Sequence, residues 1–278
     1  MDVTPTRHLP SELLMLAVLL VASIPFVLTT VYAPDEFLNL SHGARMVAGQ
    51  VIYRDFFEFV TPLSRWIPGW TFAVTGPSVL AARIVQMAFL IVGSYQAYRL
   101  VRTLGVGPWT ATLPGLMLIL TFYRMDPGYS HHWIVIPFVL GTVQAALRGL
   151  SSGGGRWWVI AGVCLGLTFL TMQSDATILG AALLGWLLVL RMLGQGTWRM
   201  LGSRLGWLTL GSALPVVAAG GYFLSQGSLH AAWYHVWVWP LSHYKQAGGT
   251  NDVQYFTDIV DYVATNTRFW VNMPFWYA

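Results

Sequence analysis

Charge is scarce in this sequence: Asp, Glu, Lys and Arg make up 9% of the 278 residues, while 55% are hydrophobic and the mean hydropathy is +0.57. A soluble domain carries about 25% charged residues, so the composition excludes an ordinary soluble domain and predicts a membrane-embedded chain. Lysine is almost missing, because fourteen of the fifteen basic residues are arginine. These arginines are scattered at the ends of apolar runs, so the excess of 15 basic over 11 acidic residues does not indicate a nucleic-acid partner.

Cysteine occurs once, as Cys164 inside an apolar segment. A single cysteine excludes an intrachain disulfide and a cysteine-rich metal site. No internal sequence repeat is detectable, and the centres of the apolar runs hold almost no charge.

Long apolar runs dominate what the sequence does contain. A helix needs roughly 20 residues to cross a ~30 Å hydrocarbon core. Seven runs approach this length: 13–32, 79–101, 109–122, 133–147, 157–170, 176–190 and 205–224. Several are shorter, so thin, tilted or broken helices are expected. The predicted fold is an all-α membrane protein with about seven transmembrane helices, forming a single polytopic domain over 1–278.

Polar segments separate these runs, the longest being a first outer loop at 33–78 and a second at 225–268. In the first loop, apolar residues at 37–47 recur at helical spacing, which predicts a short amphipathic helix in the membrane interface. Asp35, just before it, is a natural N-cap. A second short interfacial piece is expected before the next span, and a compact polar turn at 123–132.

The arginines orient the predicted helices. With the N-terminus in the cytoplasm, most cations of the short connections share the cytoplasmic side, which obeys the positive-inside bias. They are Arg7, Arg99, Arg102, Arg148, Arg156, Arg191, Arg199 and Arg204. Nine of the eleven acidic residues, all but Asp2 and Glu12, then fall on the outer side. Acids contribute little to topology, so their segregation indicates a working face turned outward.

The first outer loop opens with Asp35-Glu36, directly after the first apolar run, and the predicted interfacial helix follows this pair. Tyr53-Arg54-Asp55-Phe56 and Thr61-Pro62-Leu63 come later in the loop. This order resembles the first outer loop of the GT-C superfamily of integral membrane glycosyltransferases, in particular its protein O-mannosyltransferase-like and lipid A aminoarabinose-transferase-like members. The segment 166–173 (GLTFLTMQ) is similar to a Gly-Leu…Leu-Thr-Lys element near a later span of such enzymes. The resemblance covers roughly 13–190.

Two departures from the family pattern concern lysine. Members often have a Lys before Pro-Pro-Leu, where this chain has Val60-Thr61-Pro62-Leu63, and Met172 stands where the later Lys is common. Arginine or histidine would then have to bind the donor phosphate. Members are also usually longer, and this chain ends in what resembles the start of an eighth span. The expectation is a truncated product or a part of a larger protein, with C-terminal spans missing.

The resemblance implies an inverting membrane glycosyltransferase that moves a sugar from a polyprenyl-phosphate donor to a glycan, lipid or protein acceptor. It implies Asp35 as the general base, Glu36 as a supporting group and Asp126 as a second acid. The implied donor contacts are Arg54, Asp55, Arg65, His131, Lys245 and Arg268. No metal site and no definite cofactor are assigned, and the participation of a divalent cation is left open. The implied location is the bacterial inner (plasma) membrane, with the site facing the periplasm or exterior.

Structural roles compete with these functional ones. Asp35 can serve only as a helix cap, a contribution of about 1 kcal/mol. Asp55 and Glu58 are expected to pair with Arg54 or Arg65 rather than react, because charges near a membrane usually find partners.

Two other functions also compete with transfer. A transporter or lipid flippase is disfavoured, because such proteins tend to carry midplane charges and inverted repeats. A non-catalytic membrane subunit would use the outer loops as a docking surface. Its carboxylates would point apart or into solvent, whereas those of a transferase would converge on a hollow at the outer leaflet.

Overall fold

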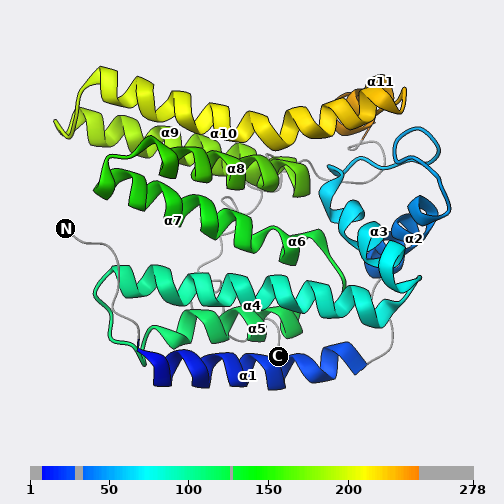
Figure 1. The fold of residues 1–278 in the computed structure, drawn as a ribbon, viewed down its shortest axis with the longest axis horizontal. Helices are drawn as coiled ribbons and strands as arrows, with labels where there is room; N and C mark the ends of the chain where they lie inside the picture. The colour runs from blue at the N-terminus through cyan, green and yellow to red at the C-terminus, as the bar shows by residue number, and fades with distance from the viewer. Residues whose placement is uncertain (1–7, 29–33, 126–127, 244–278) are drawn as a thin grey trace, which may run out of the picture.

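The computed structural model describes residues 8–28, 34–125 and 128–243 (Figure 1). In chain order its elements are α1 (Leu9–Leu28), α2 (Pro34–Val47), α3 (Leu63–Thr75), α4 (Val79–Thr103), α5 (Thr112–Met125), α6 (His131–Ile134), α7 (Ile136–Ser152), α8 (Gly155–Thr171), α9 (Gln173–Met192), α10 (Trp198–Ser225), α11 (Leu229–Trp233), the π-helix η1 (Tyr234–Val238) and α12 (Trp239–His243). The only β pairing in these residues is an isolated bridge between Ile52 and Phe56. The predicted all-α fold class is confirmed.

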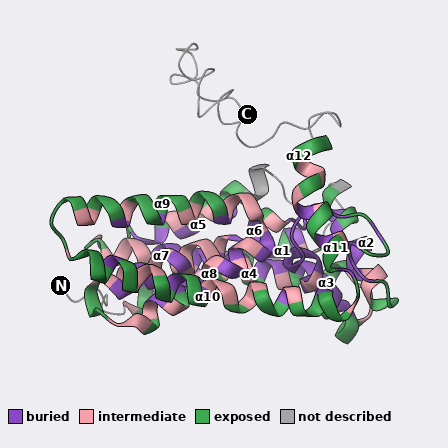
Figure 2. Ribbon diagram, turned by 90° about the horizontal axis from the view of Figure 1, so that it is seen from above, coloured by how far each residue is buried: buried purple, intermediate pink, exposed green. Residues whose placement is uncertain are grey.

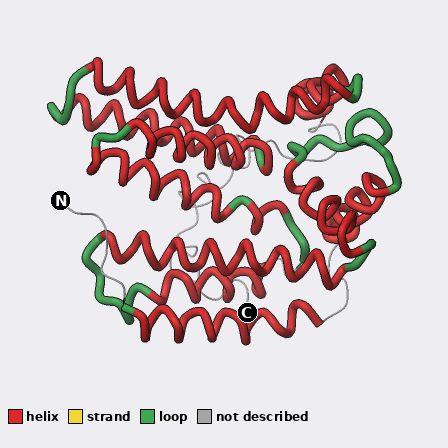
Figure 3. Tube along the Cα trace, viewed as in Figure 1, coloured by secondary structure: helices red, strands yellow, loops and turns green. Residues whose placement is uncertain are grey.

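The long helices form two groups that run along the same axis. Helices α1, α4 and α5 pack together in one group, while α8 contacts α7, α9 and α10 in the other. Contacts between α4 and α7 join the two groups. The short helices α2, α3 and α11 gather at one end of the bundle, together with the irregular segment 48–62 (Figures 1 and 3). That end is called the α2 end below.

Each of the seven predicted apolar runs contains a helix in the described part of the chain. Five helical segments are long and apolar enough to cross a membrane: Leu9–Leu28, Val79–Thr103, His131–Ser152, Gln173–Met192 and Trp198–Ser225. The other two, in α5 and α8, are shorter apolar helices, as the short runs led us to expect. The segment beginning at His131 is interrupted at Val135, where α6 ends and α7 begins, because Pro137 cannot donate an N–H to the preceding turn.

The outward faces of the bundle are apolar. Leu184, Leu188 and Val189 are exposed on α9, and Leu214 and Val217 on α10. Figure 2 shows such exposed faces along the outer helices, while the buried residues lie between the helices. Exposed apolar side chains on helices long enough to span a bilayer are what a lipid environment requires, so the fold is that of an integral membrane protein.

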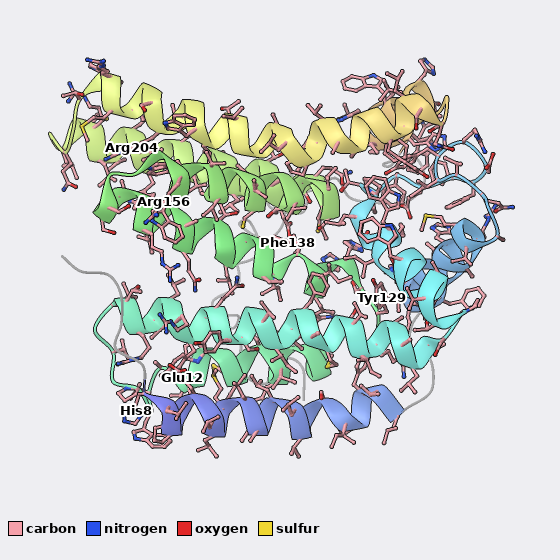
Figure 4. The ribbon with its side chains drawn as sticks, viewed as in Figure 1. His8, Glu12, Tyr129, Phe138, Arg156 and Arg204 are labelled. Atoms are coloured by element: carbon pink, nitrogen blue, oxygen red, sulfur yellow. The ribbon has the colours of Figure 1, made fainter. Side chains whose placement is uncertain are left out.

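Charged residues divide between the two ends of the bundle as predicted. His8, Glu12, Arg156 and Arg204 lie at the end remote from α2 (Figure 4). The helix termini that carry Arg102, Arg148, Arg191 and Arg199 lie at that same end. Among the other acids of the described residues, Asp35 and Glu36 lie on α2, and Asp55 and Glu58 lie in segment 48–62. Asp175 lies in the first turn of α9, where Gln173 bonds to Phe59 of that segment.

Three local predictions need correction. Asp35 is not the N-cap of the interfacial helix, because α2 begins at Pro34 and Asp35 lies inside its first turn. The polar turn predicted at 123–132 is shorter, since α5 continues to Met125. The second outer loop is mostly helical as far as it is described: a turn at 226–228 is followed by α11, η1 and α12. The second interfacial piece is confirmed as α3.

Glycines bring α8 and α10 into backbone contact. A Cβ at Gly211 would lie 2.2 Å from the carbonyl oxygen of Val159, and one at Gly162 would lie 2.1 Å from that of Leu208. Small residues allow such close approach between membrane helices, where packing rather than hydrophobic burial drives association. The α8–α10 contact therefore depends on the absence of side chains at these two positions.

We predict that Gly211→Ala lowers the thermal stability of the detergent-solubilised protein, because the added methyl forces α8 and α10 apart, at a typical cost of about 1–3 kcal/mol. Gly206, also on α10, has nothing within 4 Å of an added Cβ. Gly206→Ala should therefore unfold at the wild-type temperature or slightly above it, because alanine favours helix by about 0.5–1 kcal/mol over glycine. Equal unfolding temperatures for the two variants would contradict this account of the packing.

Candidate functional site

The first turn of α2 carries Asp35 and Glu36. Proline at the first helical position suits this start, because its φ is already helical and its missing N–H needs no partner. Neighbouring helical residues point about 100° apart, and the two acids have opposite surroundings. Asp35 is exposed, whereas Glu36 is fully buried. The pair therefore divides into one accessible carboxylate and one inaccessible one.

Glu36 forms a two-point ion pair with Arg83 of α4. The Nε and Nη2 atoms of Arg83 each donate to a Glu36 carboxylate oxygen at 2.7 Å, and its Nη1 donates to the carbonyl of Phe26 at 3.0 Å. Both side chains are 0% exposed. A guanidinium matches a carboxylate in this bidentate geometry. The pair ties the start of α2 to α4 and to the end of α1, so Glu36 sets the position of Asp35 rather than facing solvent.

Glu58, in the segment between α2 and α3, is a second buried acid. Nδ1 of His42 lies 3.1 Å from its Oε2, Arg65 of α3 donates to the same oxygen, and the backbone N–H groups of Phe59 and Val60 donate to Oε1 at 2.9 Å. Burial raises the pKa of Glu58, but the His42 hydrogen bond and the Arg65 charge outweigh it and lower the pKa to about 2. The predicted pairing of Glu58 with Arg65 is confirmed, and it fixes the loop to both interfacial helices.

Asp55 pairs with its neighbour Arg54, as predicted. Arg54 donates from Nε and Nη2 to the two carboxylate oxygens at 2.9 Å, and the N–H of Val51 donates to Oδ2 at 2.7 Å. The Arg54 hydrogen bond, followed by that of Val51, lowers the pKa of Asp55 to about 2. Arg54 also donates to the carbonyl of Gln226 at 3.2 Å. This partly exposed pair fastens the loop beside the end of α10.

His131 opens α6, directly after the N-cap Ser130. Its ring centroid lies 4.2 Å from that of His132. The Nδ1 atom of His131 is buried and has no hydrogen-bond partner in the described part of the chain. Buried polar atoms are normally paired, so this nitrogen is one that a ligand could satisfy.

The two positions where the resemblance leads one to expect lysine, Val60 and Met172, have sequence neighbours that contact each other. Nε2 of Gln173 donates to the carbonyl of Phe59 at 3.1 Å, and Oγ1 of Thr61 donates weakly to Oε1 of Gln173 at 3.5 Å. Val60 and Met172 flank these contacts in the sequence. An uncharged amide contact thus stands where the resembling enzymes would place cations.

A cavity of about 520 Å³ opens between the interfacial helices and the spans. It is lined mainly by apolar residues of α2, α3, α8 and α10, with an aromatic side formed by Trp66, Trp70 and Tyr222. Met46 and Val47 bring the last turn of α2 to this cavity. Its size and apolar lining suit a hydrocarbon chain rather than a polar ligand.

The described carboxylates do not meet at this cavity. No acidic residue lines the cavity, and Asp35, Asp55 and Glu58 have separate surroundings. Asp126, Lys245 and Arg268 lie outside the described residues. Within the described ranges no three His, Cys, Asp or Glu side chains come together as a metal-binding group.

Sequence reasoning missed three polar residues that organise this end. Arg83 and Gln86 are 0% exposed within α4, and His42 is 5% exposed on α2. The available signal was polarity inside an apolar run, since such residues are usually paired or functional. Arg83 and Gln86 are three positions apart and therefore share one face of α4. That spacing indicates a polar patch near the outer end of the span.

We predict that Arg83→Met destabilises the protein strongly, by about 3–5 kcal/mol, because it leaves Glu36 charged and buried without its partner. The double variant Glu36→Gln/Arg83→Met should be more stable than Arg83→Met alone, since neither charge then remains. Thermal unfolding of the purified variants in one detergent measures both effects. Additive losses in the double variant would contradict a direct coupling between these side chains.

Comparison with known proteins places the chain in a family. Residues 60–223, more than half of the chain, match the family model described as dolichyl-phosphate-mannose-protein mannosyltransferase. The match does not include α2. No curated protein and no solved structure matches the chain. Together with the membrane helices, the match shows that the chain belongs to the dolichyl-phosphate-mannose-protein mannosyltransferase family, a GT-C family of integral membrane glycosyltransferases.

Proposed function

We propose that this protein transfers a sugar from a polyprenyl-phosphate donor to an acceptor at the outer face of the membrane, with Asp35 as the general base. The observation that carries the proposal is the placement of α2. Its first turn presents an exposed carboxylate, and its last turn borders an apolar cavity. A lipid-tethered sugar needs both a chain-binding surface and a base at the water boundary. One short helix brings the two together.

The proposed chemistry is a single displacement. The acceptor oxygen attacks the anomeric carbon while its proton passes to the Asp35 carboxylate. The bond between the anomeric carbon and the phosphate oxygen breaks, and the polyprenyl phosphate leaves with the electron pair. One displacement inverts the anomeric centre. Asp35 suits this role because its carboxylate is exposed on α2, whereas Glu36 is already engaged by Arg83.

The donor phosphate gathers charge as it leaves, and cations or hydrogen-bond donors can stabilise it. The two lysine positions of the resembling enzymes are uncharged here, so the proposed contacts are His131 and Arg54, together with Arg65, which would have to share its charge with Glu58. Support comes from the unpaired Nδ1 of His131 and from the hydrogen bond of Arg54 to the Gln226 carbonyl, just after α10, the helix whose Tyr222 lines the cavity. Asp55 then holds Arg54, and Asp126, Lys245 and Arg268 remain proposed on the resemblance alone.

The proposed donor chain lies in the cavity between α3 and the spans α8 and α10. Asp35 and Met46 are eleven residues apart on α2, about 16 Å along the helix axis. The phosphate and sugar would occupy this interval, with the isoprenoid chain entering from the bilayer. The family description supports a mannose-type donor, and we propose a protein or glycan hydroxyl as acceptor. The proposed setting is a bacterial plasma membrane, with the α2 end facing the exterior.

A non-catalytic membrane subunit is the second candidate. It is favoured by one observation, that the described carboxylates do not converge on the cavity. In that case Asp35 and the Arg54–Asp55 pair would form part of a docking surface. The same assay separates the two candidates, because a docking subunit neither binds the donor nor turns it over.

We predict that Asp35→Asn lowers kcat by about 10²–10⁴-fold, the usual contribution of a general base, while donor binding is retained. The assay uses proteoliposomes, mannosyl polyprenyl phosphate and a peptide rich in serine and threonine, and it measures released polyprenyl phosphate. Ser41→Ala, on the same helix, removes only a local bond to the Leu38 carbonyl and should leave turnover unchanged. Equal turnover by Asp35→Asn and wild type would remove Asp35 from the mechanism.

A second prediction concerns the cavity. Ala73 lines it, so Ala73→Phe should raise the donor KM by on the order of tenfold, because displacing two CH₂ groups forfeits ~0.8 kcal/mol each. The value of kcat at saturating donor should change little. Val74→Phe is the matched control, since Val74 is 88% exposed and does not line the cavity. A donor KM raised equally by both substitutions would mean that the isoprenoid chain of the donor does not bind in this cavity.

A further inference from the structure

The three residues Gly128–Ser130 directly precede α6 and form neither helix nor strand. Buried side chains from two helices hold them. Nδ2 of Asn39 donates to the carbonyl of Tyr129 at 3.1 Å. Nε2 of Gln86 donates to the carbonyl of Gly128 at 2.9 Å, and the N–H of Ser130 donates to Oε1 of Gln86 at 2.7 Å. The segment is therefore fixed to α2 and to α4.

Tyr129 adds a third attachment. Its side chain is 0% exposed and packs in the core beside Leu40 and Leu63. Its hydroxyl lies 3.4 Å from the carbonyl of Ser64 on α3. Figure 4 shows Tyr129 at the α2 end of the bundle. Three separate helices thus hold three consecutive residues.

Asn39 connects this segment to the first turn of α2. The same Nδ2 atom that donates to Tyr129 also donates to the carbonyl of Asp35 at 2.6 Å. One amide group therefore joins the backbone of Asp35 to the segment that leads to His131. Asn39 is 1% exposed, so water does not compete for these bonds.

This arrangement carries a cost that packing alone does not explain. Burying a primary amide is unfavourable unless its hydrogen bonds are made. Oδ1 of Asn39 is nevertheless buried without a partner in the described residues. An apolar side chain would avoid that penalty but could not hold two carbonyl groups. The amide at position 39 is thus suited to fixing geometry rather than to maximising stability.

We propose that Asn39 and Gln86 are positioning residues for sugar transfer: they fix the Gly128–Ser130 segment against the first turn of α2, so that Asp35 and His131 keep one relative position. The inference rests on the proposed function, in which Asp35 is the base and His131 a phosphate contact. Reacting groups must be held near their attack geometry, and a displacement of about 1 Å can cost 10²-fold in rate. Neither amide touches the substrate in this proposal.

The test compares Asn39→Leu and Gln86→Met, which keep similar volumes and remove the amides. Gln144→Met is the matched control, because its Nε2 donates to the Gln96 carbonyl between α7 and α4, away from the α2 end. Transfer is assayed per folded protein in proteoliposomes with mannosyl polyprenyl phosphate. Backbone hydrogen exchange at Gly128–Ser130 is measured on the same preparations and does not depend on activity.

The proposal predicts faster exchange at Gly128–Ser130 in both variants, a fall in kcat on the order of tenfold to a hundredfold, and a donor KM within about twofold of wild type. The control should lose stability but keep kcat. Unchanged exchange, or faster exchange with unchanged kcat, would overturn the inference while leaving the proposed function standing. Absence of transfer by wild type itself would overturn the proposed function, and this inference with it.

Discussion

The buried ion pair between Glu36 and Arg83 is the interaction on which the α2 end depends. Two parallel hydrogen bonds at 2.7 Å join α2 to α4, and a third from Arg83 reaches the carbonyl of Phe26 near the end of α1. With both side chains fully buried, neither charge has an alternative partner in water. A pair of this kind adds little net stability over apolar packing, but it is costly to break. It therefore specifies where α2 lies, and with it where Asp35 is presented.

The same logic recurs across the irregular segment between α2 and α3. Backbone groups near a bilayer need partners, because lipid supplies none. Glu58 meets this need for Phe59 and Val60, and Gln173 meets it for the Phe59 carbonyl. Buried side chains thus supply the backbone hydrogen bonds that a helix or sheet would otherwise supply. The result is a loop at the α2 end whose backbone is held by side-chain hydrogen bonds.

Composition and run length were enough to predict the helical class and the approximate places of the apolar helices, because lipid exposure imposes apolar residues over a defined length. The Asp55–Arg54 and Glu58–Arg65 pairs were also predictable, since charges close in sequence near a membrane pair locally. The Glu36–Arg83 pair was not, because the two residues are 47 positions apart and no local pattern joins them. The same holds for Asn39 with Tyr129, which are 90 positions apart. The helix start at Pro34 escaped prediction because Asp35 satisfies the rules for a cap and for a first-turn residue equally well.

The central claim is that the α2 end binds the donor, with the sugar at Asp35 and the lipid chain beside α3. The most direct test is a structure of the protein in lipid nanodiscs with a non-transferable carbon-linked analogue of mannosyl polyprenyl phosphate. The account predicts the anomeric carbon beside the Asp35 carboxylate and the isoprenoid chain against Trp66 and Tyr222. Density for the sugar at the opposite end of the bundle, among the arginines, would contradict it.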